Sequence, residues 1–234
     1  MNITVWNEFR HENRNDAVKA IYPDGIHEYI KGFLQNEENS VRCATLDEPE
    51  CGLSKEVVDS TDVMLWWGHM AHNEVPDEIV ARVKDAVLKG MGLIVLHSGH
   101  HSKLFKSLIG TTGNLSWGDE VKERIWCINP AHPIAEGVPQ YFELEKEEMY
   151  GEPFDIPNPD EVIFTSWFES GYVFRSGCTF TRGRGRIFYF QPGHETVPSY
   201  HNETVQKIIK NAVNWAKPHK KASELICPRV ENLE

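Results

Sequence analysis

Short apolar runs alternate with amphipathic segments through the first half of this 234-residue chain. Residues 63–67 and 93–97 are near-continuous apolar runs, of the kind found in strands that are buried on both faces. Between them, residues 75–88 place Ile79 and Val83 on one face of a helix. Strands that alternate with helices over short connections predict right-handed crossovers. We therefore expect an α/β fold with a mostly parallel sheet that is covered by helices on both faces.

The second half of the chain has a different pattern. Strand-like segments follow one another after residue 160, and a glycine-rich turn at 181–185 predicts an added antiparallel strand region. The polar residues 7–16 are expected to form a loop. We interpret 1–217 as a single domain and 218–234 as a C-terminal extension. Further strands are expected at 3–6, 40–46, 162–166, 172–181 and 186–191, and further helices at 25–34, 54–60, 100–108 and 204–216.

Charge and composition exclude several classes of protein. With 24 Lys and Arg against 35 Asp and Glu, the net charge is −11, and no nucleic-acid partner is expected. The apolar runs are too short to span a bilayer and the first residues do not resemble a signal peptide, so we expect a cytoplasmic protein without a membrane partner. The five cysteines form no CxxC pair, which predicts reduced thiols. The seven tryptophans allow for a self-association surface, and a homo-oligomer is expected.

Histidines gather immediately after the predicted strands. Seven of the 11 histidines lie in four such segments. Ligands of open α/β sheets bind outside the carboxyl ends of the strands, so these segments should meet at one edge. A single histidine is usually structural, whereas this concentration predicts a functional site. The seven are His11, His69, His72, His97, His100, His101 and His194, and Glu195 follows the last of them.

Imidazole nitrogens from different strand ends could converge on one metal ion. The predicted ligands are His69, His97 and His194, with Glu148 or Glu195 as the carboxylate. Zinc or another divalent ion is the expected metal. There is no HExxH motif, so no spacing in the sequence defines the ligand set. In the alternative without a metal, His97, His194 and Glu195 act on a polar ligand as acids, bases or hydrogen-bond donors.

A different chemistry would use Ser98, which is predicted to lie at a sharp turn from strand to helix, the place of a nucleophile elbow. His194 and Glu195 could complete a catalytic triad with it. The bulk of the preceding residue, His97, argues against such an elbow, which requires small neighbours. Residues 147–153 are a further source of a general base or a metal-binding carboxylate, unless they form a solvated acidic turn.

Aromatic side chains beside these loops suit a sugar ligand. Trp67, Trp117, Tyr150 and His11 are the predicted substrate-binding residues. Trp117 lies in the polar segment 113–118 and is expected to be exposed. Large aromatic side chains mostly fill protein cores, so a structural role is the alternative for each of the three aromatic residues.

An ordered set of motifs resembles the trehalose-utilisation (ThuA-like) family, a branch of the class I glutamine-amidotransferase-like fold. The resemblance covers nearly the whole chain. It implies a flavodoxin-like arrangement of the sheet and a role in disaccharide catabolism, with trehalose or a related keto-glycoside as the ligand. The motifs are DVMLWWGH at 62–69, GLIVLHS at 92–98, NPAHPIAEG at 129–137, EEMYGE at 147–152, and residues 185–195.

The chain departs from the amidotransferase pattern at the nucleophile. That fold carries a cysteine at the elbow, where this sequence is expected to place Ser98, and none of the five cysteines is near. Glutamine hydrolysis through a thioester is therefore excluded. Three hypotheses remain open. The protein is an enzyme acting on a sugar derivative through its histidine-rich site, a non-catalytic sugar-binding or regulatory module, or a serine hydrolase.

Overall fold

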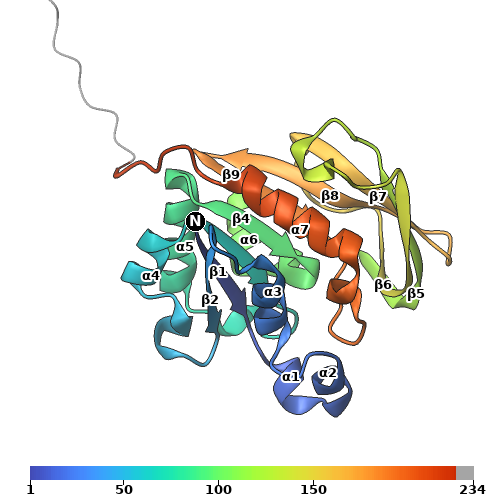
Figure 1. Ribbon diagram of the computed structural model, residues 1–234, viewed down its shortest axis with the longest axis horizontal. Helices are drawn as coiled ribbons and strands as arrows, with labels where there is room; N and C mark the ends of the chain where they lie inside the picture. The colour runs from blue at the N-terminus through green and yellow to red at the C-terminus, as the bar shows by residue number, and fades with distance from the viewer. Residues whose placement is uncertain (225–234) are drawn as a thin grey trace, which may run out of the picture.

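The computed structural model describes residues 1–224, which form one nine-stranded sheet with helices packed on it (Figure 1). None of the helices in this part of the chain is long and apolar enough to cross a membrane. The strands are β1 (Asn2–Asn7), β2 (Ser40–Thr45), β3 (Val63–Trp67), β4 (Gly92–Leu96), β5 (Ser116–Cys127), β6 (Tyr141–Gly151), β7 (Glu161–Phe168), β8 (Val173–Arg182) and β9 (Gly185–Phe190).

The first half of the sheet is parallel, as the alternating pattern predicts. Its strands lie in the order β2-β1-β3-β4-β9, and each neighbouring pair is parallel. The chain proceeds from β1 to one side for β2 and to the other side for β3. This reversal creates a switch point between β1 and β3, where a crevice opens at the carboxyl ends of the strands.

The second half of the sheet is antiparallel, and the prediction of a mostly parallel sheet is wrong. The order continues β9-β8-β7-β5-β6, so four of the eight strand pairings within residues 1–224 are antiparallel. Antiparallel neighbours need no crossover helix, and the chain accordingly contains no α-helix between Ile109 and Glu203. Strands β5 and β6, here called the β5–β6 ribbon, form the far end of the sheet from β2 (Figure 1).

Helices cover both faces of the parallel half, as predicted. Side chains on β4 alternate between the two faces: Leu93 and Val95 pack in one core, and Ile94 and Leu96 pack in the other. Helices α4 (Lys55–Ser60), α5 (Asp77–Lys89) and α6 (Lys103–Ile109) supply the first core, and α3 (Ile26–Leu34) and α7 (Glu203–Ala216) supply the second.

The segment expected to be a loop after β1 is helical instead. Helices α1 (His11–Arg14) and α2 (Asp16–Ile21) occupy it, and the side chain of Asn15 caps α2 by accepting a hydrogen bond from the amide of Ala17. These two helices are short and mostly polar, so the segment lacks the apolar periodicity by which a helix is predicted. Four cysteines are free thiols, and Cys227 lies outside the described residues with the rest of the predicted extension after residue 224.

Replacing Gly185 by Ala should destabilise the fold markedly. Gly185 is the first residue of β9 and lies against the last turn of α5. A Cβ atom at this position would lie 2.2 Å from the carbonyl oxygen of Val87. Because backbone cannot yield easily, we expect the free energy of unfolding to fall by about 2–3 kcal/mol in urea titrations. Gly32→Ala in α3 is the control: it meets nothing within 4 Å and should stabilise by about 0.5–1 kcal/mol. Equal urea concentrations at the unfolding midpoints of Gly185→Ala and Gly32→Ala would contradict this prediction.

Candidate functional site

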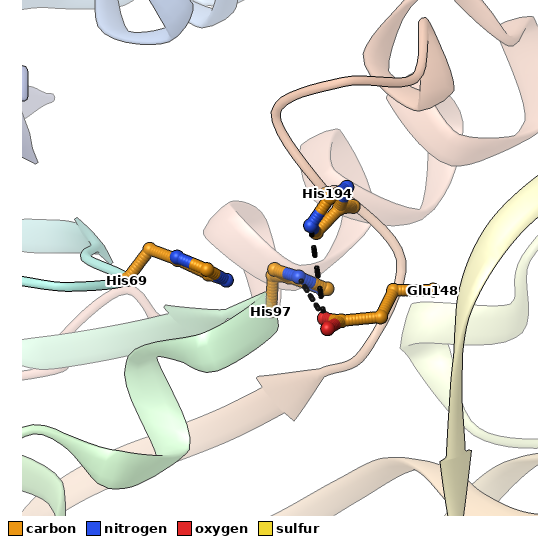
Figure 2. A group of neighbouring side chains, drawn as sticks. All are labelled: His69, His97, Glu148 and His194. Atoms are coloured by element: carbon orange, nitrogen blue, oxygen red, sulfur yellow. Dashed lines mark ion pairs between the residues drawn. The ribbon is translucent and has the colours of Figure 1, made fainter. Parts of the chain in front are cut away.

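Four side chains from distant parts of the chain converge at the carboxyl edge of the sheet (Figure 2). His69 follows β3, His97 follows β4, His194 follows β9, and Glu148 comes from β6. Each offers one nitrogen or oxygen atom, and these four atoms all lie within 4.8 Å of one another. The set is the one predicted from the sequence, with Glu148 as the carboxylate. We call it the four-residue cluster.

The strand end at β4 is strained at His97, one residue before the predicted elbow. His97 has a φ of +48°, in the left-handed region that side chains larger than glycine rarely adopt. It opens a short 3-10 helix, His97–His101, which turns the chain sharply away from β4. The elbow position is therefore occupied by His97 and not by Ser98, and the expectation placed on Ser98 is corrected.

Two contacts fix the orientation of His97. Its Nδ1 lies 2.8 Å from the carbonyl oxygen of Gln191, to which it donates, so Nε2 is the nitrogen that faces the cluster. Nε2 lies 3.0 Å from Oε2 of Glu148 and 3.4 Å from the hydroxyl of Tyr150, whose ring stacks on the imidazole. Burial would lower the pKa of His97, but the close carboxylate of Glu148 outweighs it and raises that pKa to about 9. Burial likewise opposes ionisation of Glu148, yet His97 holds its pKa at about 2.

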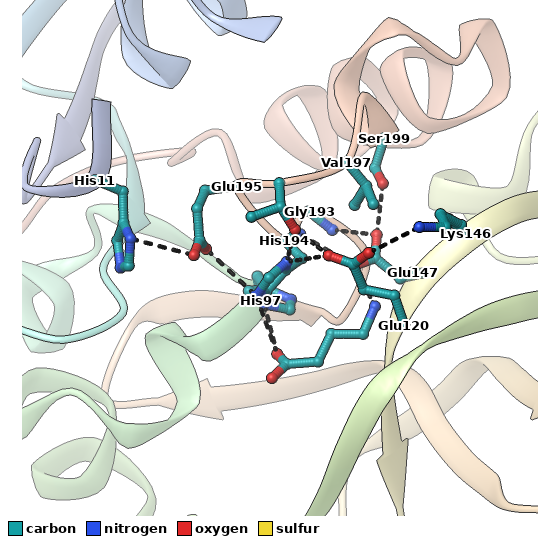
Figure 3. Close-up of polar contacts among 12 residues, drawn as sticks. His11, His97, Glu120, Lys146, Glu147, Gly193, His194, Glu195, Val197 and Ser199 are labelled. Carbon is teal, nitrogen blue, oxygen red and sulfur yellow. Dashed lines mark hydrogen bonds and ion pairs between the residues drawn. The ribbon is translucent and has the colours of Figure 1, made fainter. Parts of the chain in front are cut away.

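His194 is held by a carboxylate that the sequence did not indicate. Its Nε2 faces Glu148 Oε2 at 4.0 Å and Glu195 Oε2 at 3.6 Å. Its Nδ1 lies 2.6 Å from the hydroxyl of Thr196 and 3.3 Å from Oε1 of Glu120, and Thr196 also donates to Glu120 (Figure 3). Glu120 belongs to β5, a strand that was not predicted, so no signal in the sequence pointed to it.

If the four-residue cluster holds a divalent metal ion, replacing Glu120 by Gln should weaken the binding of that ion without abolishing it. Carboxylates that orient a ligand histidine are typically worth 10- to 100-fold in metal affinity. We expect a decrease of about that size for Glu120→Gln, measured by competition between the protein and a chelator. Lys146→Ala is a control, because it removes a third partner of Glu120, at 3.4 Å, and leaves His194 and Thr196 in place. An affinity equal to that of the wild type in Glu120→Gln would show that Glu120 does not orient His194.

A second group of side chains adjoins the four-residue cluster. His11 Nδ1 lies 3.2 Å from Glu195 Oε1, and His11 Nε2 lies 3.1 Å from Nδ1 of His69. His11, His69 and Glu195 also bring three ligand atoms within 4.8 Å of one another. His69 therefore links the two groups. His11, predicted to bind substrate, lies here on α1, next to Glu195, and lines neither of the cavities described below.

Two further carboxylates hold the backbone of the site. Glu147 is fully buried and accepts hydrogen bonds from the amides of Gly193 (2.8 Å) and His194 (3.1 Å) and from the hydroxyl of Ser199 (2.5 Å). Glu8 accepts from the amides of Met70 and Ala71, at 2.8 and 3.0 Å, and so fixes the loop of His69. The sequence places both carboxylates beside the site, but only the structure shows that they bind backbone.

Residues 147–153 do not form the solvated acidic turn considered above. Glu147 to Gly151 continue β6, and the side chains of Glu147 and Glu148 are buried. Glu148, on the edge strand β6, contacts His97, which directly follows the central strand β4. The ribbon therefore bends back over the ends of the parallel strands. Irregularities in the β5–β6 pairing, between Gly118 and Glu120 and between Val121 and Glu123, accompany this bend.

Two cavities open beside the four-residue cluster. The inner cavity has a volume of about 280 Å³ and the outer cavity about 410 Å³. Trp117, which is 73% exposed, and Glu148 line both. The inner cavity is also lined by His69, His72, Ser98, His100, His101, Asn114, Leu115 and Tyr150, and the outer one by Gly118, Asp119, Glu120, Lys146 and His194.

Two of the residues predicted for the site, Trp67 and Ser98, do not have the contacts expected of them. Trp67 is fully buried in the core and its indole donates to the carbonyl oxygen of Gly193, so it supports the loop of His194 and does not line either cavity. Ser98 lines the inner cavity, but its hydroxyl makes no hydrogen bond within the described residues. The predicted triad of Ser98, His194 and Glu195 is therefore not formed.

Burial keeps several of the other histidines neutral. It lowers the pKa of His69 to about 4 and the pKa values of His72 and His100 to about 3. A neutral imidazole has a free lone pair, which a metal ion or a donor hydroxyl can use. The four cysteines in residues 1–224 lie outside both cavities.

The sequence and the fold were compared with known proteins. The model of the ThuA family, described as trehalose utilisation, matches residues 2–216. None of the curated proteins matches the sequence significantly.

Solved structures of the same fold include a ThuA-like protein from Parabacteroides merdae ATCC 43184, which is 17% identical over 95% of this chain and 92% of its own, with a TM-score of 0.70. A protein from Salmonella typhimurium LT2, described as cytoplasmic, is 13% identical over 93% and 100%, with a TM-score of 0.61. A protein from Thermoplasma acidophilum, described as a GMP synthase subunit, is 12% identical over 92% of each chain, with a TM-score of 0.51. At such identities the likeness shows the fold alone, which is similar to glutamine-amidotransferase-like folds.

Proposed function

We propose a function from the premise that this chain belongs to the ThuA family, whose description is trehalose utilisation. In this proposal the protein is an enzyme that acts on a sugar or keto-glycoside derivative at the four-residue cluster. A divalent metal ion, with zinc as the first candidate, is held by His69, His97, His194 and Glu148. The ligand is a small molecule that enters from the cavities beside the cluster.

The convergence of the four ligand atoms is the observation that carries this proposal. Three imidazole nitrogens and one carboxylate oxygen are a donor set that suits zinc and similar ions. Oε2 of Glu148 is buried and its close partner is His97 Nε2, at 3.0 Å, so this carboxylate oxygen faces the imidazole nitrogens of the cluster. Metal binding releases protons from its ligands, so a cation among these atoms would take the place of the proton between His97 and Glu148. The residues therefore fit a metal ion.

The chain supplies orientation and proton transfer at this site. When bound, a metal ion would act as a Lewis acid toward a sugar hydroxyl or carbonyl oxygen. Gln191 fixes the tautomer of His97, and Glu120 with Thr196 fixes the ring of His194. Glu195 Oε2 is buried, without a hydrogen-bond partner in the described chain, and 3.6 Å from His194 Nε2. Glu195 lines neither cavity, so its carboxylate would act on the imidazole of His194 and not directly on a ligand hydroxyl.

Metal analysis of the purified, tag-free protein tests this proposal. We expect about one zinc or similar ion per chain in the wild type and a loss of the ion in His194→Ala. His201→Ala, which removes an exposed histidine outside the cluster, is the matched control and should retain the metal. If neither the wild type nor the control contains or binds a divalent ion, the metal part of the proposal is refuted.

A non-catalytic sugar-binding or regulatory module is the second candidate. Its support is the elbow itself, where His97 stands in place of the nucleophilic cysteine of the amidotransferase pattern. In that case a sugar from a panel of disaccharides would bind and be recovered unchanged. Conversion of any of these sugars by the wild type, and not by His194→Ala, would show that the protein is an enzyme and not a binding module.

A further inference from the structure

We infer that an uncovered face of the antiparallel half of the sheet is a dimer interface, and that its partner is a second copy of this chain. Strands β5, β6, β7 and β8 form this face, which we call the outer sheet face. Its central side chains are Arg124, Trp126, Tyr141, Glu143, Trp167 and Val173. The inference specifies a surface for the homo-oligomer expected from the sequence, and it does not depend on the proposed function.

The strand register places these side chains on one side of the sheet. Residues that lie directly opposite each other in antiparallel strands point to the same face, and so do residues two apart on one strand. Arg124 is opposite Glu143 on β6 and Trp167 on β7. Trp126, two residues after Arg124, is opposite Tyr141. The side chains therefore form two adjacent rows that cross neighbouring strands.

This face is left uncovered by the cores of residues 1–224. The other face of the same strands packs in the core that α7 supplies, through Ile125, Phe142 and Phe164. Helices α4 and α5 lie at the opposite end of the sheet from the β5–β6 ribbon (Figure 1). Trp167 and Val173, which are opposite each other on β7 and β8, belong to neither core and are 40% and 51% exposed. A contiguous exposed apolar patch on a folded protein marks an interaction surface.

Arg124 is held in a fixed position at the centre of the face. Its guanidinium carbon lies 5.0 Å from the ring centroid of Tyr141 and 5.9 Å from that of Trp126. The same group donates two hydrogen bonds to Oε1 of Glu143, at 2.6 and 2.8 Å. Arginine, tryptophan and tyrosine carry much of the binding energy at protein interfaces. Side chains that are ordered before binding also lose little conformational entropy when the partner binds.

Charge favours a second copy as the partner. The whole chain has a net charge of −11, so two copies repel each other over most of their surfaces. The outer sheet face is balanced instead, because Lys122 and Arg124 on β5 are paired with Glu143 on β6, and Glu145 lies at the rim. A two-fold axis through the face lays β5 of one copy over β6 of the other. Each Arg124 then meets Glu143 of the partner subunit, and the face is complementary to itself, as a two-fold interface must be.

The interface leaves the strand-end site open. Trp117 is the second residue of β5, and Arg124 follows seven residues later, roughly 20 Å away along an extended strand. None of the six central residues of the outer sheet face lines either cavity. Association through this face should therefore leave the metal content unchanged.

Sedimentation velocity on the full chain, from micromolar to submillimolar concentrations, tests this inference. The wild type should sediment as a dimer. Arg124→Glu and Glu143→Arg should each raise the dissociation constant at least roughly thirtyfold, because each variant places like charges opposite each other across the two-fold axis. Mixed in equal amounts, the two variants should form a dimer again, because each offers the charge that the other lacks.

A matched pair of apolar variants tests the same face without a change of charge. Trp167→Ser should weaken the dimer. Met70→Ser removes a 56%-exposed apolar side chain from the loop after β3 and should leave the dimer unchanged. Circular dichroism confirms that each variant is folded.

Three results would overturn the inference. A wild type that remains monomeric throughout the concentration range would show that the outer sheet face does not bind a second copy. Variants that remain dimeric would assign the dimer to another surface. A mixture of Arg124→Glu and Glu143→Arg that remains monomeric would refute the pairing of β5 with β6 across a two-fold axis.

Discussion

Glu148→Gln should eliminate tight metal binding and lower kcat/KM for a converted sugar by about 10²- to 10⁴-fold. The amide keeps the size of the side chain but removes the negative charge that lies 3.0 Å from His97 Nε2. It also removes the one carboxylate of the four-residue cluster, while the wall that both cavities share keeps its size. Elemental analysis after dialysis and steady-state kinetics measure the two effects.

Glu145→Gln is the control for this variant. Glu145 lies on the same strand, its side chain is 88% exposed, and its closest cation is Lys122 at 3.6 Å. Metal content and turnover should both be unchanged in it. Wild-type metal content in Glu148→Gln would mean that the carboxylate is not a ligand, and the function would then have to be assigned to the histidines alone.

Glu147→Ala should be among the most destabilising single changes in the chain. The carboxylate is the acceptor for three backbone amides, those of Glu148, Gly193 and His194, and for the hydroxyl of Ser199. Each buried donor left without a partner costs about 1–3 kcal/mol, so the free energy of unfolding should fall by about 3–5 kcal/mol. Urea titrations followed by circular dichroism measure this loss.

Glu147→Gln separates the loss of charge from the loss of an acceptor. It retains one oxygen and should recover part of the stability, while the Glu145→Gln protein should unfold like the wild type. Because Glu147 binds the amide of His194, metal affinity should also fall in Glu147→Gln. A stable Glu147→Ala protein with full metal content would show that the loop keeps its conformation without this carboxylate.

The parallel half of the fold was predictable because four of its five strands, β1, β3, β4 and β9, are buried on both faces over most of their length. Burial of this kind produces unbroken apolar runs, such as the one that forms β3, and helices packed on them have apolar periodicity. The β5–β6 ribbon lacks that signal. Much of β5 is only partly buried, and several of its outward side chains are charged, so neither unbroken nor regular alternating hydrophobicity marks it.

The sequence was sufficient to predict which histidines meet at the site, but not all of the side chains that contact them. Topology alone places the residues after β3, β4 and β9 at one edge, which is why His69, His97 and His194 could be chosen together. Glu120 was missed because its strand was missed. Trp67 was assigned to the ligand because it precedes the loop of His69, but strand alternation points its ring into the core.

The site joins two kinds of architecture that can change separately. The histidines stand on the ends of parallel strands, where a shift in one strand would disturb two packed cores. The β5–β6 ribbon supplies Trp117, Glu120 and Glu148, and its outer surface is largely free of such packing. Substitutions along the ribbon can therefore alter which glycoside is accepted while the imidazoles stay in place. Within such a family, substrate range would diversify on the ribbon and reaction type would be inherited with the parallel strands.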